Sequence, residues 1–385
     1  MEEVKKLVEL VRNHYGTNDF IPLHAPRFNG NEKRYVSDTL ESTFVSSVGA
    51  YVGKFEDQVC TFTGAGAAVA TVNGTAALHT ALFLSGVRSG DIVITQALTF
   101  VATCNTIAHL GATPLFIDVC RESLSLCPIA LEDYLSAHSE IRDGQCYHTC
   151  GARIASVMPM HTFGHPAKMD ALKEVCERYH ITLVEDAAES LGSFYKNQHT
   201  GTFADFSALS FNGNKVITTG GGGMVLCGTP ELGQRAKHIT TTAKVAHAYE
   251  FYHDELAFNY RMPNINAALG CAQMEQLPAY LKNKRRLAAT YKAHFNNSEL
   301  VFVDEPQDAH SNFWLNALLC PSRQYRDAFL KQSNSAGIMT RPVWQLMHTL
   351  PMFNSAPRGP LTNSEFLADH LVNIPSSVAP EKEVR

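Results

Sequence analysis

The chain has 385 residues, of which 45% are hydrophobic and 18% charged, so it can bury a deep core and is too apolar for lasting disorder. Its formal net charge is −5 and no block of lysine or arginine stands out, which argues against nucleic acid or an anionic membrane surface as a partner. Ten scattered cysteines are too few for a disulfide scaffold and favour reduced thiols in a cytoplasmic protein.

The first predicted element is an amphipathic helix over residues 1–16, with apolar residues every three or four positions among charged ones. It lacks the apolar centre of a secretion signal. Two uncharged stretches, 58–87 and 92–117, are long enough to cross a membrane, but both carry polar residues in their interior. We therefore interpret them as buried elements of a protein with no membrane association.

Apolar, β-rich runs then alternate with helical patterns. The predicted strands are 67–72, 92–95, 113–117, 154–159, 181–184, 206–211 and 224–226. The helices predicted between the first five are 76–84, 101–109 and 169–179. Short, fully apolar strands joined by helices are typical of a mainly parallel sheet with both faces covered, so we expect a large α/β domain.

The remainder of the chain predicts a smaller α+β domain. A long helical pattern covers 265–295 and leads away from the sheet, and the elements predicted beyond it are a strand at 313–319 and helices at 326–335 and 364–371. We divide the chain into an N-terminal segment, a large α/β domain and a small C-terminal domain, at residues 1–45, 46–264 and 265–385.

Polar residues follow several of the predicted strands, at the edge of the sheet where α/β proteins bind ligands. Asn73-Gly74-Thr75 begins a helix, and the free N–H groups there could hold a phosphate, although the same residues also cap ordinary helices. Asp186 ends a buried strand, where it could meet a cationic group of a cofactor or serve as a helix cap or structural ion-pair partner.

Lys215 ends an uncharged stretch and is soon followed by four glycines, 220–223. Burial lowers the pKa of an amine and so makes it a nucleophile for a carbonyl group. A solvated lysine beside a glycine turn is the alternative. The glycines do not form a nucleotide P-loop, because the Lys-Ser or Lys-Thr that completes one is absent.

Two groups of potential metal ligands lack the spacing of a metal site. Cys146, His148 and Cys150 have no second ligand pair at the distance of a structural zinc site, and His161 and His165 lack the glutamate of a helical zinc-protease motif. We expect no metal at either place.

Five motifs occur in an order that resembles one known family. They are Asn73-Gly74-Thr75, Leu98-Thr99-Phe100-Val-Ala-Thr, Glu185-Asp186-Ala-Ala-Glu189, Ser210-Phe211 with Lys215, and Asn259-Tyr260-Arg261-Met262. Over nearly the whole chain the set resembles the pyridoxal-phosphate-dependent nucleotide-sugar aminotransferases, the DegT/DnrJ/EryC1/StrS family. Motifs at 44–52, 212–215 and 337–348 look most like its LegC-type branch. The resemblance implies the aspartate-aminotransferase-like fold (type I) and a homodimer with active sites at the subunit interface.

The resemblance also implies roles for the cofactor site. Lys215 would bond to pyridoxal 5′-phosphate and then carry the proton between substrate and cofactor. Asp186 would keep the ring nitrogen of the cofactor protonated, and Phe100 would stack on the ring face.

The phosphate of the cofactor would be bound by Thr75, Ala76 and Ser210, and by Asn259 of the neighbouring subunit. Glu189 stands where many relatives of the resembled family have glutamine near the phenolic oxygen of the cofactor. The resemblance therefore implies that Glu189 belongs to the cofactor site but leaves its contact open, because two anionic oxygens would repel each other there unless one is protonated or water intervenes.

The substrate side of the site is implied at Ser46, Ser47, Arg261, Arg341 and Trp344. An arginine offers a planar pair of donors for a carboxylate or diphosphate, although either arginine could instead pair with a structural acid.

The expected activity is transfer of an amino group from glutamate to a nucleotide-linked 4-keto-6-deoxy-N-acetylhexosamine, UDP-linked in preference to GDP-linked, for bacillosamine- or legionaminic-type glycans. The alternatives are a sugar dehydratase of the same family, which carries histidine where Lys215 stands, and a non-catalytic regulator that binds the cofactor or a sugar nucleotide.

Overall fold

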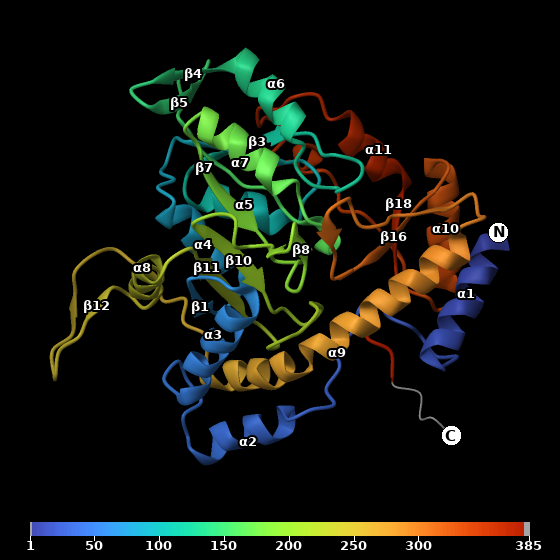
Figure 1. Ribbon diagram of the computed structural model, residues 1–385, viewed down its shortest axis with the longest axis horizontal. Helices are drawn as coiled ribbons and strands as arrows, with labels where there is room; N and C mark the ends of the chain where they lie inside the picture. Colours follow the sequence, from blue (N-terminus) through green and yellow to red (C-terminus); the bar gives the residue numbers. More distant parts are fainter. Residues whose placement is uncertain (1, 381–385) are drawn as a thin grey trace.

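The central sheet has seven strands in the computed structural model, which describes residues 2–380 (Figure 1). In spatial order they are β1 (Ala67–Thr71), β11 (Gly223–Cys227), β10 (Phe206–Ser210), β7 (Thr182–Asp186), β6 (Ile154–Val157), β2 (Ile92–Gln96) and β3 (Thr113–Ile117). The strand β11 runs in the direction opposite to the other six. The seven predicted strands and the mainly parallel sheet are confirmed, with ends that differ by a residue or two.

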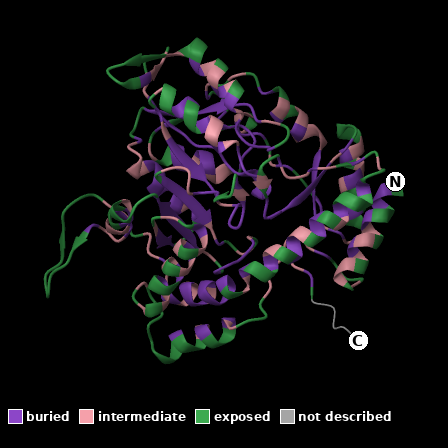
Figure 2. Ribbon diagram, in the orientation of Figure 1, coloured by how far each residue is buried: buried purple, intermediate pink, exposed green. Residues whose placement is uncertain are grey.

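Helices cover both faces of the sheet because its strands are apolar on both sides, and Figure 2 shows the strands buried. One face packs against α4 (Gly74–Leu84), α5 (Val101–His109) and α8 (Pro230–Thr240). The other face packs against α6 (Pro128–His138) and α7 (Met169–Arg178) at one end and against α3 (Ala50–Thr63) and α9 (Asn264–Phe295) at the other. The predicted helices at 76–84, 101–109 and 169–179 are therefore confirmed as α4, α5 and α7.

The long helix α9 (Asn264–Phe295) confirms the helix predicted at 265–295 and links the two parts of the molecule. Its first half contributes Ala267 and Cys271 to the core beside the sheet, and its second half contributes Leu287 and Tyr291 to the core of the C-terminal part. Pro278 lies between the two halves, where it removes one helical hydrogen bond, and Figure 1 shows that the helix changes direction along its length.

The C-terminal part has a second sheet of four short strands. Their order is β14 (Val301–Phe302), β16 (Asn316–Leu319), β18 (Leu371–Ile374) and β17 (Arg341–Pro342). The helices α10 (Arg323–Ser335) and α11 (Thr362–His370) pack beside it.

Two predicted boundaries in this part were wrong for local reasons. The strand expected at 313–319 begins only at Asn316, because Phe313 has a φ of 47°, which breaks the extended backbone. Helix α10 begins three residues before the predicted 326, because the side chain of Ser322 caps it by accepting a hydrogen bond from Tyr325 N at 3.2 Å.

The N-terminal segment lies along both parts. Helix α1 (Glu2–Tyr15), the predicted amphipathic helix, buries Val4, Leu7 and Val11 in the C-terminal core, while α2 (Glu32–Glu41) packs on α9. The division of the chain at residues 45 and 264 stays a prediction.

Three small antiparallel sheets lie outside the two main sheets. They are β4 (Ser139–Arg142) with β5 (Gln145–His148), β8 (Phe194–Tyr195) with β9 (Gln198–His199) and β15 (Ala309–His310), and β12 (Lys244–Val245) with β13 (Tyr252–His253). The β12–β13 arm extends away from the body in Figure 1 and is coloured exposed in Figure 2. It carries the exposed apolar side chains Tyr249, Phe251 and Leu256.

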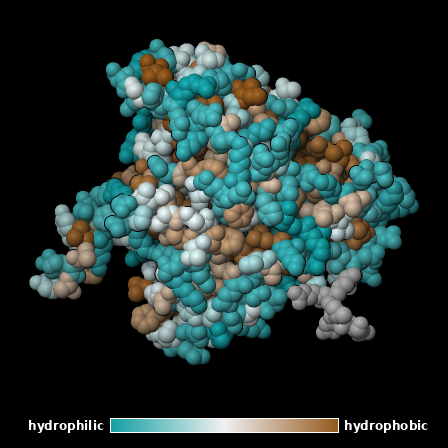
Figure 3. Space-filling model, in the orientation of Figure 1, coloured by the Kyte–Doolittle hydropathy of each residue, from teal (hydrophilic) through white to brown (hydrophobic). Residues whose placement is uncertain are grey.

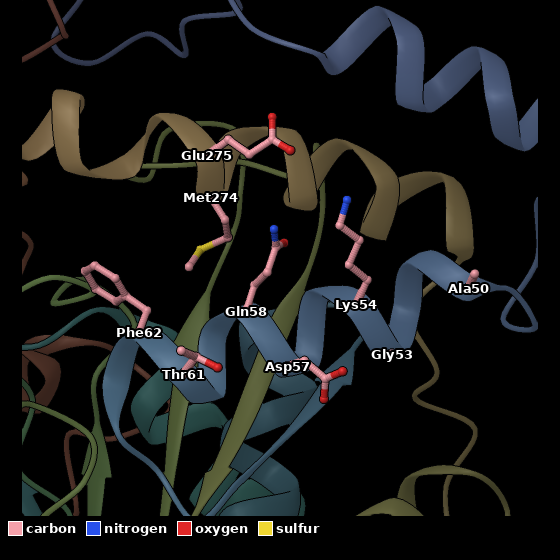
Figure 4. A pocket seen from close by; sticks show the side chains of 9 residues that line it. All are labelled: Ala50, Gly53, Lys54, Asp57, Gln58, Thr61, Phe62, Met274 and Glu275. Atoms are coloured by element: carbon pink, nitrogen blue, oxygen red, sulfur yellow. The ribbon is translucent and has the colours of Figure 1, made fainter.

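Much of the surface is hydrophilic in Figure 3, with hydrophobic side chains in small groups scattered over that face. An open groove of about 750 Å³ lies between α3 and α9, where Lys54 and Gln58 point from α3 toward α9 (Figure 4). In the described part of the chain, no helix combines the length and the apolar character needed to cross a bilayer.

Candidate active site

A cavity of about 310 Å³ lies beyond the carboxyl ends of the central strands. The loops that follow β1, β2, β7 and β10 contribute to its wall, as expected for an α/β sheet. Of the residues that the sequence singled out, it brings together Thr75, Phe100, Asp186, Glu189, Ser210, Lys215 and Trp344.

Asp186 is the last residue of β7 and is almost completely buried. Its Oδ2 accepts a hydrogen bond from Thr103 Oγ1 at 2.7 Å, and its Oδ1 accepts one from Ala188 N at 3.2 Å. Burial raises the pKa of this carboxyl group, and the two hydrogen bonds and the nearby charge of Lys215 oppose that rise. A cationic group in the cavity would therefore stabilise the ionised form of Asp186.

Lys215 lies in the turn after β10, where its backbone N–H donates to Asn212 O at 3.0 Å. Its Nζ lies 3.3 Å from Glu189 Oε1 and 4.0 Å from the centre of the Trp314 ring. The amine is thus held inside the cavity, and the structure excludes the solvated surface lysine that the sequence left open.

Glu189 is buried and faces the same amine. Its Oε2 accepts a hydrogen bond from Phe163 N at 2.9 Å. Burial raises the pKa of this carboxyl group to about 7, and the charge of Lys215 and the hydrogen bond from Phe163 limit the rise. Glu189 is therefore able to hold a proton near neutral pH.

The N-terminus of α4 points at the cavity and forms a small cradle. Asn73 caps the helix by accepting a hydrogen bond from Ala76 N at 2.8 Å, so the cap that the sequence left as an alternative is present. A Cβ atom at Gly74 would lie 2.8 Å from Ser210 Cβ and 3.0 Å from Ser210 Oγ. The absence of a side chain at Gly74 thus leaves the Ser210 hydroxyl beside the free N–H groups of the helix, which is a donor set for an anion.

Aromatic rings form another wall of the cavity. Phe100, 47% exposed, immediately precedes α5 and lies 6.2 Å from Trp344 between ring centres, at an angle of 61°. Trp344 in turn lies 5.2 Å from Phe163. These rings offer an apolar face to a flat ligand.

Other predicted residues lie outside the wall of this cavity. Ala76 has its N–H engaged by Asn73. Asn259 is exposed and accepts a hydrogen bond from Arg261 Nε at 2.9 Å. Ser46 and Ser47 precede α3 and Arg341 is exposed on β17, and none of these is among the cavity-lining residues.

Sequence reasoning gave no role to two residues that shape the site, although one of them closes the motif at 98–103. Thr103, which bonds to Asp186, lies three positions after Phe100 at the start of α5, so its place on the inner side of the first helical turn was a usable signal. Trp314, which lies over Lys215, is about one hundred positions away in the chain, and its indole N–H donates to Asn214 O at 2.6 Å. Nothing in its local sequence indicated that contact.

The histidines and cysteines that the sequence analysis considered as metal ligands lie in different parts of the structure. The Nε2 atom of His161 lies 3.1 Å from Glu185 Oε2, and its Nδ1 accepts a hydrogen bond from Ala167 N at 3.0 Å. His165 is buried beside Phe313, and burial lowers its pKa to about 4. Cys146 and His148 belong to the β4–β5 hairpin, and Cys150 follows it.

Comparison with known proteins decides the family. The sequence matches the DegT/DnrJ/EryC1/StrS aminotransferase family over residues 26–384. The chain belongs to this family. It is 35% identical to a GDP-perosamine synthase of Escherichia coli O157:H7 over 358 residues, 93% of each chain. It is also 35% identical to EpsN of Bacillus subtilis, described as a pyridoxal phosphate-dependent aminotransferase, with 87% of this chain and 84% of the relative covered.

Solved structures confirm the fold. The aminotransferase TlmJ of Streptoalloteichus hindustanus superposes with a TM-score of 0.84 at 24% identity, covering 93% of each chain. The protein is a pyridoxal-phosphate-dependent sugar aminotransferase with the predicted α/β transferase fold.

The cavity fits pyridoxal 5′-phosphate. It offers a lysine amine, a buried carboxylate for a protonated ring nitrogen, an aromatic face, and the cradle at Gly74 for a phosphate.

Proposed function

We propose that this aminotransferase moves an amino group from glutamate to a UDP-linked 4-keto-6-deoxy-N-acetylhexosamine and so forms a 4-amino sugar for bacillosamine- or legionaminic-type glycans. The observation that carries the reaction type is the amine of Lys215, held in the cavity between Glu189 and Trp314 and near Asp186. The LegC-like motifs at 44–52, 212–215 and 337–348 support the choice of sugar.

Bound pyridoxal phosphate supplies an electron sink for the carbon that loses or gains a proton. Lys215 would bond to the cofactor and then carry that proton, since its Nζ reaches into the cavity. Asp186, fixed by Thr103, would hold the proton on the ring nitrogen. Phe100 would keep the ring flat by stacking on it.

The phosphate would be held at the start of α4 by Thr75, Ala76 and Ser210. The cradle at Gly74 supports this assignment, because the helix dipole contributes roughly 0.3 to 1 kcal/mol toward an anion. The N–H of Ala76 already donates to the side chain of Asn73, so it is not a free donor for the phosphate. Ala76 would contribute only because its backbone lies in the first turn of the helix.

We further propose a homodimer in which Asn259 reaches the phosphate of the partner's cofactor. Asn259 and the neighbouring Arg261 are accessible at the surface and lie outside the cavity wall of their own chain, which supports a role across an interface. The exposed apolar arm and the groove between α3 and α9 provide surfaces for association.

The sugar nucleotide would be bound by Ser46, Ser47, Arg261, Arg341 and Trp344. The position of Trp344 supports a sugar-nucleotide site next to the cofactor, because Trp344 lines the cofactor cavity and also a neighbouring cavity of about 370 Å³. The reaction would take place in the cytoplasm, the compartment favoured by the unpaired cysteines of the described chain.

A GDP-linked 4-keto-6-deoxy sugar is the second candidate substrate. It is favoured by the relatives of Escherichia coli and Vibrio cholerae, both named GDP-perosamine synthases, the latter 32% identical over 361 residues. The dehydratase and the non-catalytic regulator are disfavoured, because the lysine is present and lies in the cavity.

Initial-rate kinetics with glutamate and matched UDP- and GDP-linked keto sugars test the proposal. Glutamate must leave as 2-oxoglutarate before the sugar reacts, so double-reciprocal plots should give parallel lines. We expect the UDP-linked N-acetyl sugar to have the higher kcat/KM. A higher value for the GDP-linked sugar would select the second candidate, and intersecting lines would contradict a two-step amino transfer.

A further inference from the structure

One completely buried amide outside the assigned roles connects three loops around the cavity. Gln96 is the last residue of β2. Its Nε2 lies within hydrogen-bond distance of Leu98 O (2.9 Å), Thr162 Oγ1 (2.9 Å) and Leu124 O (3.3 Å). Its Oε1 accepts from Leu126 N (2.9 Å) and Met160 N (3.0 Å). Both ends of the amide are therefore fully used.

The atoms that Gln96 contacts belong to the segments that follow β2, β3 and β6. Beyond the ends of the strands, backbone groups no longer pair within the sheet, and a buried backbone group without a partner destabilises the fold. Thr162 strengthens the junction, because its Oγ1 also donates to Leu124 O at 2.9 Å. The amide thus fixes the three loops relative to one another.

Two of these segments lead directly to the cofactor cavity. The segment after β2 continues to Phe100, which lines the cavity, and the segment after β6 contains Met160, which lines it too. The next residues of the latter include Phe163, whose N–H donates to Glu189. Fixing Met160 and Thr162 therefore fixes a hydrogen bond to the carboxyl group that faces Lys215.

A short relay connects the same junction with Asp186. Thr99 Oγ1 lies 2.8 Å from Met160 Sδ and 2.7 Å from Thr103 Oγ1, and its single proton goes to Thr103, because Thr103 uses its own proton for Asp186. Thr103 then donates to Asp186 at 2.7 Å. Both buried carboxyl groups of the cavity thus depend on segments that Gln96 holds.

We propose that Gln96 is a positioning residue of this aminotransferase, which sets the places of Phe100 and of the hydrogen-bond donors to Asp186 and Glu189. It touches neither the cofactor nor the substrate in this role. The inference deepens the proposed function and rests on it, because it concerns the same cavity, but it is tested with the cofactor and glutamate and does not depend on the identity of the sugar.

The test compares cofactor binding and turnover in Gln96→Met and Thr162→Val with the wild type. Gln96→Met keeps the length of the side chain and removes all of its hydrogen bonds, while Thr162→Val removes one partner at nearly constant shape. A displacement of about 1 Å at a reacting group costs about 100-fold in rate. We expect Gln96→Met to lower kcat for the glutamate half-reaction by about that factor and to raise the Kd of pyridoxal phosphate, with smaller changes in Thr162→Val.

Asn316→Leu is the matched control. It removes another completely buried amide, whose Nδ2 donates to Ser376 Oγ at 3.1 Å in the C-terminal part, outside the cavity wall. The control should lower the Tm and leave the cofactor Kd and kcat within about twofold of wild type.

Gln96→Glu serves as the conservative variant. It keeps the oxygen that accepts from Leu126 and Met160 and, when protonated, one donor, so cofactor affinity should recover toward wild type as the pH falls. Two results together would overturn the proposal. Thr162→Val would have the Kd and kcat of the wild type, and Gln96→Met or Gln96→Glu would bind the cofactor with wild-type affinity. If Gln96→Met does not fold, the Thr162→Val and Gln96→Glu results decide it.

Discussion

Asp186, Glu189 and Lys215 place two buried carboxyl groups and one amine around a single cavity. Burial raises the pKa of both carboxyl groups, and Lys215 opposes the rise in each. This distribution of charge distinguishes Glu189 from a neutral glutamine at the same place.

The apo-protein should show the cost of burying Glu189 as the pH rises. The folded-state pKa of about 7 lies above the ordinary value of 4.5, so the folded protein binds more protons between these values and its stability relative to Glu189→Gln falls with rising pH. The full difference is about 3 kcal/mol. We expect the free energies of unfolding of wild type and variant to diverge between pH 4.5 and 8, with the variant gaining. A constant difference across that range in urea titrations would refute the raised pKa.

At the level of single residues, sequence reasoning found groups that belong to motifs. Asp186 and Ser210 are the last residues of β7 and β10, Lys215 lies in the turn after β10 and Thr75 in the first turn of α4, so their convergence in one cavity followed from the sheet. The Trp314 contact arises from tertiary packing between distant segments, and no periodicity or local motif encodes such packing.

Helix α4 shows how an element can bind a charge without a charged side chain. Its first turn has no acidic or basic residue, yet its free N–H groups and positive dipole end point at the cavity beside Ser210. The close approach of Gly74 to Ser210 makes this geometry possible.

Gly74→Ala should weaken binding of the phosphate. The new Cβ would meet Ser210 Cβ at 2.8 Å and so displace the hydroxyl or the start of the helix, at a cost of about 1 to 3 kcal/mol. We expect the Kd of pyridoxal phosphate to rise about tenfold or more and that of pyridoxal, which lacks the phosphate, to change little. Equilibrium dialysis measures both.

Gly228→Ala is the control for this substitution, because a Cβ there would lie 3.5 Å from Asp205, an ordinary van der Waals distance, and Gly228 is outside the cavity wall. It should leave both constants unchanged. An unchanged Kd for pyridoxal phosphate in Gly74→Ala would argue against the cradle as the phosphate site.

Helices and strands could be predicted from the sequence where burial in the core determines which residues are apolar. Fully apolar runs of about five residues gave the central strands, and long helical periodicity gave α9. The strand predicted at 313–319 was too long, because the positive φ of Phe313 depends on a local arrangement of Ser311 and Asn312 side chains that hydropathy does not report.

At the scale of the whole molecule, the cavity lacks several of the groups that the family resemblance assigns to it. Asn259, Arg261 and Arg341 lie outside its wall, while the β12–β13 arm exposes large apolar side chains to solvent. Both features fit a protein whose site is completed by a second copy.

Replacing the apolar side chains of the arm should weaken the proposed dimer. We expect Tyr249→Ser with Phe251→Ser to lower the molar mass in light scattering from that of a dimer toward that of a monomer and to lower kcat in parallel, since both side chains are 81% exposed in the single chain. Ile129→Ser, at a 72% exposed position on α6, is the control and should change neither. A wild-type protein that is monomeric and fully active would contradict the shared site.

The most direct test of the central claim is the absorption spectrum of the purified protein with pyridoxal phosphate, before and after glutamate, beside Lys215→Ala. The amine of Lys215 lies in the cavity, so the wild type should show the band of the covalently bound cofactor and lose it when glutamate is added. Lys215→Ala should bind the cofactor without forming that band. A wild-type spectrum that glutamate leaves unchanged, or a variant that reproduces the wild-type response, would contradict the account.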